Sequence, residues 1–128
     1  MPTTPDHFQT ITQIAERLAS GQLKSIDITR STLDRIDRLD GKLKSYATVM
    51  SEHAIAADEK ADEEIASGNY RGTLHGIPIA VKDLCFTKGV RTMGGSQALA
   101  DHLPEFDGTV VANLEAAGAV LLGKLNLT

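Results

Sequence analysis

Apolar residues recur at helical spacing in three stretches of the first half of the chain. In the first stretch, about residues 10–20, isoleucine, alanine and leucine share one face of a helix. Thr10 and Gln13 fit a capping box at its start, and Gly21 is placed to end it. The pattern predicts an amphipathic helix whose apolar face belongs to the core.

Two further helices follow in the sequence. A second apolar face begins after Ser25 and ends before Gly41. A third, alanine-rich stripe runs from Met50 to Ile65, with acidic residues off the stripe. Because alanines let neighbouring elements approach closely, we expect this helix to pack tightly. Residues 1–70 are therefore predicted to be a helical segment.

At about residue 73 the pattern changes from helical spacing to short, continuous apolar runs. The run "IPIAV" at 77–81 is typical of a strand covered on both faces. Pro78 indicates either the first residue of a strand or a strand at the edge of the sheet. Residues 85–106, rich in glycine and polar residues, are predicted to be a loop.

A fourth helix and a second strand are predicted in the remaining residues. Asp107 or Thr109 would cap the helix and Gly118 would end it, before the buried strand "AVLLGK" at 119–124. Strand, connection with helix, and strand form a crossover unit of a parallel or mixed sheet. The fold class is therefore α/β, in which N-terminal helices lead into a mixed, largely parallel sheet flanked by helices.

This sheet is expected to be incomplete, because two strands make a poor sheet on their own. The chain stops at "VLLGKLNLT", in or just after an apolar segment and without a polar tail. We interpret residues 1–128 as the N-terminal part of a single domain, with residues 71–128 as the start of its α/β core.

Composition narrows the range of partners. The chain of 128 residues is 41% hydrophobic, enough for one domain core, and its 13 basic and 17 acidic residues argue against a phosphate-binding surface. Cys85 is the single cysteine, so no internal disulfide can form. The N-terminus does not resemble a signal peptide, and no apolar run is long enough to span a bilayer. We expect a soluble cytoplasmic protein that binds neither nucleic acid nor membrane directly.

The stretch "HGIPIAVKD" places Lys82 at the end of the first predicted strand. An amine held against apolar surroundings loses hydration that its charged form needs, and can become a general base. On the pattern alone, a lysine that ends a strand and extends to water is the favoured interpretation. Asp83 would favour the ammonium if the side chains met, but neighbours in a strand point to opposite faces.

Cys85 and Ser96 are weaker candidates for a nucleophile. Cys85 has no histidine near it in sequence, and a free structural cysteine is favoured. Ser96 lies in "GGSQ", which lacks the G-x-S-x-G frame, so a plain turn is favoured.

Two patterns would suggest nucleotide or metal binding, and neither is supported. The run "GAVLLGKL" at 118–125 has the spacing of a phosphate loop, but its residues are bulky and Leu125 replaces the required hydroxyl. The histidines lack paired ligand spacing; they are His7, His53, His75 and His102. We expect no cofactor and no metal.

Three segments read together resemble the amidase signature family: "ITRSTLDRIDRLDGKLKSYATV", "LHGIPIAVKDLCFTKGVRTMGGS" and "FDGTVVANLEAAGAVLLGKLNLT". The most specific element is the string G-I-P-x-x-V-K-D at 76–83. The resemblance implies a serine, cis-serine, lysine triad in which Lys82 is the base. It also implies that both serines and the oxyanion loop lie downstream of "GKLN", outside this chain.

The resemblance implies an amidohydrolase that cleaves the C–N bond of a small-molecule carboxylic amide to an acid and ammonia or an amine. The fragment alone is expected to be inactive, and a homodimer is one option for the full-length protein. One alternative is the glutaminase-type subunit of a tRNA-dependent amidotransferase. Another is a non-catalytic helical interaction module, in which Lys82 is structural.

Overall fold

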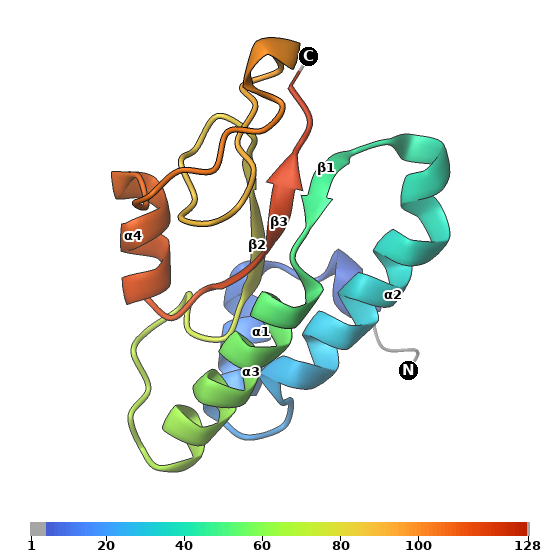
Figure 1. The fold of residues 1–128 in the computed structure, drawn as a ribbon. Helices are drawn as coiled ribbons and strands as arrows, with labels where there is room; N and C mark the ends of the chain where they lie inside the picture. The colour runs from blue at the N-terminus through green and yellow to red at the C-terminus, as the bar shows by residue number, and fades with distance from the viewer. Residues whose placement is uncertain (1–4, 128) are drawn as a thin grey trace.

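The computed structural model describes residues 5–127 and places helices on both faces of a small sheet (Figure 1). In chain order the elements are η1 (Asp6–Phe8), α1 (Ile11–Ala19), α2 (Ser25–Leu43), β1 (Tyr46–Val49), α3 (Ser51–Ala66), β2 (Pro78–Lys82), η2 (Gln97–Leu99), α4 (Thr109–Ala116) and β3 (Val120–Leu125). The α/β class is confirmed. Within residues 5–127, no helix combines the length and the apolar character needed to cross a bilayer.

The sheet has the strand order β1-β3-β2. β2 and β3 run parallel, as predicted, whereas β1 pairs antiparallel with β3, so the sheet is mixed. Pro78 is the first residue of the edge strand β2, where its missing N–H breaks no ladder. Burial was expected for both strands. It is found on the central strand β3, whereas the edge strand β2 is only partly buried.

The strand β1 was not predicted. Its four residues lie between two helices, and its partner β3 is distant in sequence. The pairing depends on Gly123, because a Cβ there would collide with the carbonyl oxygen of Thr48 and lie 2.9 Å from the Tyr46 ring. A glycine in β3 therefore lets β1 approach closely.

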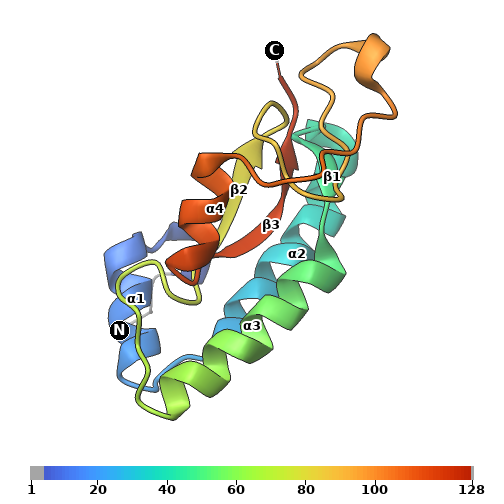
Figure 2. The same ribbon diagram turned by 60° about the vertical axis from the view of Figure 1, so that its left-hand side comes forward.

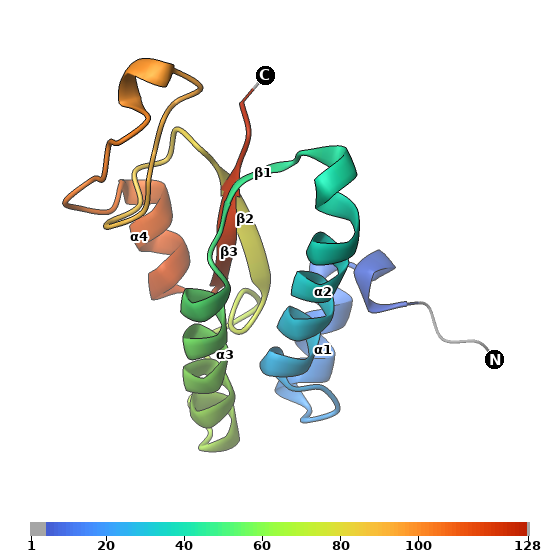
Figure 3. The ribbon, with the colours of Figure 1, turned by 45° about the vertical axis from the view of Figure 1, so that its right-hand side comes forward.

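The helices form two layers, one on each face of the sheet. α4 lies on one side of β2 and β3, opposite α2 and α3 in Figure 2 and opposite α1 and α2 in Figure 3. Val111 of α4 packs with Val81 and Leu121, whereas Ala54 of α3 packs with Val120 and Leu122 of β3. Alternate side chains of β3 thus enter two different clusters.

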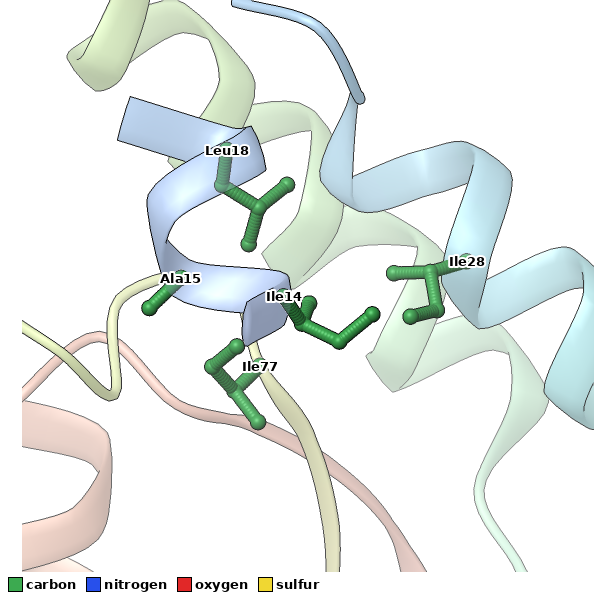
Figure 4. Close-up of a cluster of buried hydrophobic side chains, with 5 residues drawn as sticks. All are labelled: Ile14, Ala15, Leu18, Ile28 and Ile77. Carbon is green, nitrogen blue, oxygen red and sulfur yellow. The ribbon is translucent and has the colours of Figure 1, made fainter. Parts of the chain in front are cut away.

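The helix α1 forms as the sequence predicts. Thr10 and Gln13 make both hydrogen bonds of the capping box. The buried face of the helix packs against α2 and the segment before β2 (Figure 4). This cluster consists of Ile14, Ala15, Leu18, Ile28 and Ile77.

The helix α2 is longer than predicted and is capped from another helix. It passes through Gly41 and ends at Leu43, and its C-cap Lys44 adopts a left-handed conformation with φ 57°. At its start, the Asp62 carboxylate of α3 accepts hydrogen bonds from the N–H groups of Ser25 and Ile26, at 2.7 and 3.1 Å. An acidic side chain from α3 thus satisfies two free donors of α2.

The start of α4 also differs from the prediction. Gly108 is the N-cap, and no side chain caps the helix. Asp107 instead accepts a hydrogen bond from the N–H of Lys88, at 2.7 Å. A contact with the preceding loop therefore replaces the expected cap.

Asp58 is fully buried where α2, α3 and the turn before β2 meet. Its Oδ1 accepts from Ser25 Oγ at 2.6 Å and from Thr29 Oγ1 at 2.7 Å, whereas Oδ2 has no hydrogen-bond partner within residues 5–127. Ser25 Oγ is also 2.7 Å from the carbonyl oxygen of Gly76. One hydroxyl proton cannot serve both acceptors at once; if Asp58 carries a proton on Oδ1, it donates to Ser25 Oγ and the Ser25 hydroxyl donates to Gly76. Burial raises the pKa of Asp58 to about 6.

We expect Gly123→Ala to destabilise the protein by about 1–3 kcal/mol, because the added methyl group pushes β1 away from β3. Gly41→Ala is the matched control: nothing lies within 4 Å of a Cβ built there, and alanine favours a helix by about 0.5–1 kcal/mol. Urea denaturation of the 128-residue chain measures both effects. Equal stability of the two variants would contradict the role given to Gly123.

Asp58 should make stability depend on pH. Its pKa is 3.8 when unperturbed and about 6 in the fold, so the folded state binds its proton more tightly. Stability is therefore complete below about pH 4 and falls by roughly 3 kcal/mol as pH rises through 6. We expect Asp58→Asn to remove this decline and Asp34→Asn, an exposed control, to keep it. Parallel curves for wild type and Asp58→Asn, in urea denaturation from pH 4 to 8, would refute the assignment.

Candidate functional site

The candidate site lies at the carboxyl ends of β2 and β3. Because these strands are parallel, both end at the same edge of the sheet, where ligands of open α/β sheets usually bind. In the register of the pair, Lys82 lies opposite Leu125. The loop after β2, coloured yellow to orange, and the residues after β3 both lie at this edge (Figure 1).

Lys82 is the last residue of β2, and its side chain is exposed. Its Nζ donates a hydrogen bond to the carbonyl oxygen of Asn126, at 3.2 Å. Asn126 is itself held, because its N–H and its side-chain amide donate to the carbonyl oxygens of Ser45 and Lys44. The described part of the chain thus orients Lys82 but does not bury it. Its role as a base stays a prediction.

Asp83 points away from Lys82, as strand alternation predicts, and is buried. Its Oδ2 accepts from the N–H of Met93 at 3.2 Å, and its carbonyl oxygen accepts from the N–H of Gly94 at 2.8 Å. Its own N–H donates to the carbonyl oxygen of Leu125, at 2.9 Å. Asp83 therefore joins the end of β2 to β3 and to the glycine-containing turn.

Lys124, on the neighbouring strand, is the lysine that the fold buries: its side chain is 0% exposed. Its Nζ donates to Thr92 Oγ1 at 2.8 Å and lies 3.5 Å from Asp83 Oδ1. Burial lowers the pKa of Lys124, and the Asp83 carboxylate opposes that effect. In the sequence, Lys124 stands out only through a phosphate-loop spacing, although it too follows an apolar run.

The weaker candidates have structural positions. Ser96 Oγ accepts from the N–H of Ala98 and caps the start of η2, as a residue of a plain turn can. Cys85 is half-buried beside the cluster of Val81, Val111 and Leu121. The run 118–125 contains the strand β3 where a phosphate loop would need open backbone.

His75 is buried beside Glu64 of α3, in a hydrogen-bond network that does not include Lys82 or Lys124. Its Nδ1 accepts from the N–H of Arg71 at 3.0 Å, and its Nε2 lies 3.4 Å from Glu64 Oε2. Burial lowers the pKa of His75. The neutral ring fills a space that only glycine leaves open at 118, because a Cβ at Gly118 would collide with it.

A parallel strand pair flanked by helices is an α/β arrangement, and Lys82 lies at the carboxyl edge where ligands of such sheets usually bind. A family model described as Amidase matches residues 27–128, and the chain belongs to this family, the amidase signature enzymes.

Relatives include both amidases and a component of an amidotransferase. The chain is 52% identical over 118 residues to AmiD of Mycobacterium tuberculosis (strain ATCC 25618 / H37Rv), named as a candidate amidase; the match covers 92% of this chain and 25% of AmiD. It is 47% identical over 117 residues to a glutamyl-tRNA(Gln) amidotransferase subunit of Geobacter metallireducens (strain ATCC 53774 / DSM 7210 / GS-15), covering 91% and 24%.

Among solved structures, the peptide amidase of Stenotrophomonas maltophilia superposes with a TM-score of 0.90 at 34% identity, covering 96% of this chain and 26% of that one. The chain thus spans about a quarter of the length of the proteins that it matches.

Proposed function

We propose that the protein containing this chain is an amidohydrolase that cleaves the C–N bond of a carboxylic amide. The observation that carries the proposal is the family match over residues 27–128, which includes Lys82 at the carboxyl end of β2. The substrate would be a small-molecule amide, and the location cytoplasmic.

In the proposed reaction, Lys82 is the base of a serine, cis-serine, lysine triad. A serine hydroxyl is a weak nucleophile until a base takes its proton. A neutral Lys82 would accept a proton from the bridging serine, which takes one from the attacking serine. The attacking oxygen bonds to the amide carbon, the C–N bond breaks, and the leaving nitrogen receives the proton through the same relay. Water then releases the acid from the acyl-enzyme.

The geometry at Lys82 is compatible with this role. A neutral amine has two N–H donors and one lone pair. One N–H donates to the carbonyl oxygen of Asn126, which leaves the lone pair free to accept a proton. Since Lys82 is exposed here, the burial that favours a neutral amine would come from the remainder of the protein.

A second function is favoured by a specific likeness. The 47% identity to the Geobacter amidotransferase component supports a glutaminase that transfers ammonia to a partner. Glutamine hydrolysis that a synthetase-like partner stimulates, without hydrolysis of simple amides, would favour this alternative.

The test uses the full-length protein with aliphatic and aryl amides and detects released ammonia. We expect Lys82→Ala to lower kcat by on the order of 10²–10⁴, the usual range for loss of a general base. Lys60→Ala, at a position whose side chain is 71% exposed, should keep the wild-type rate. Hydroxylamine should trap the acyl group as a hydroxamate in wild type. A folded Lys82→Ala protein with wild-type turnover would disprove the role of Lys82 and favour the non-catalytic module.

The 128-residue chain by itself should release no ammonia from the same amides, since both triad serines are proposed to lie downstream of it. The measurement is a parallel assay of the chain and the full-length protein at equal concentration. Turnover by the isolated chain would show that the nucleophile lies within it.

A further inference from the structure

The buried ion pair of Lys124 and Asp83 has no part in the proposed chemistry, yet it lies directly beneath the site. Burying two charges costs several kcal/mol, and an apolar pair of similar volume is often as stable. Stability alone is therefore a poor explanation of this pair. The segments that the pair joins offer a better explanation.

The pair joins three segments. Lys124 lies on β3 and donates to Thr92, which precedes the turn that begins at Met93. Asp83 directly follows Lys82 and binds the N–H groups of Met93 and Gly94 through its carboxylate and its carbonyl oxygen. The ammonium and carboxylate thus link β3, the end of β2 and the turn in one buried unit.

Lys82 is held by hydrogen bonds to the end of β3 and to the residue that follows it. Val81 pairs with Lys124 in the register, and Lys82 pairs with Leu125. The N–H of Asp83 donates to Leu125, and Lys82 Nζ donates to the carbonyl oxygen of Asn126. A shift of β3 relative to the end of β2 would therefore move the amine of Lys82.

We propose that Lys124 is a positioning residue: through Asp83 and Thr92 it fixes the peptide after Lys82 and the turn at 92–96, and so sets where the Lys82 amine lies. The inference rests on the proposed amide hydrolysis for its effect on rate. Its effect on the turn is independent of activity.

The first test is kinetic and uses the full-length protein. We expect Lys124→Met to lower kcat about tenfold or more with KM within about twofold, because a small misplacement of a reacting group is costly. Lys60→Met, which removes an exposed lysine, should leave both constants unchanged. Wild-type kcat in a folded Lys124→Met protein would overturn the proposal.

A second variant separates positioning from stability. In Lys124→Met with Asp83→Asn, no uncompensated buried charge remains, so thermal stability should recover while kcat stays low. Recovery of kcat together with stability would assign Lys124 a structural role only. Should Lys124→Met fail to fold, Thr92→Val removes the acceptor of Lys124, together with the hydrogen bond that the hydroxyl donates to the carbonyl oxygen of Val90, with little change of shape. We then expect kcat to fall about three- to tenfold, and an unchanged kcat would overturn the proposal.

Hydrogen exchange of the amides at 92–96 provides the readout that does not depend on activity. We expect these amides to exchange at least about tenfold faster in Lys124→Met, or in Thr92→Val if the former does not fold, than in wild type. Unchanged protection would refute the positioning role. If wild type hydrolyses no amide, the proposed function fails, and hydrogen exchange alone decides whether Lys124 holds the turn.

Discussion

The central position of β3 is the constraint on which the rest of the structure depends. β3 pairs with β1 on one side and β2 on the other, and its alternate side chains enter two clusters formed by different helices. Gly123 makes the first pairing sterically permissible, and the parallel second pairing brings Lys82 to the edge that also carries Asn126. Helices that are far apart in sequence thus pack on β3, and β3 in turn fixes the strand that carries the Lys82 amine.

Local signals in the sequence were enough to predict the elements that depend on them. The capping box of Thr10 and Gln13 involves residues three apart, and it forms as predicted. The strand β1 could not be predicted in the same way, because four residues become a strand only when Gly123 lets β3 approach. The end of α2 was likewise missed, because its left-handed C-cap is Lys44, a non-glycine residue, and the helix continues through Gly41.

The two lysines show where prediction of the site reached its limit. Lys82 and Lys124 each end an apolar run, and the sequence pattern cannot distinguish them by burial. Strand order does: the edge strand exposes Lys82, whereas the central strand buries Lys124 against Thr92 and Asp83. The prediction that Lys82 and Asp83 point to opposite faces needed only strand alternation, and it is confirmed.

The capping of α2 by Asp62 has a consequence for the order of folding. The carboxylate and the N–H groups that it binds are 37 and 36 residues apart, so the first turn of α2 gains this partner only after the chain has reversed through β1 and α3. The first turn of α2 therefore gains this stabilisation only when the loop between the two helices has closed, so part of the stability of α2 is tied to the docking of α3.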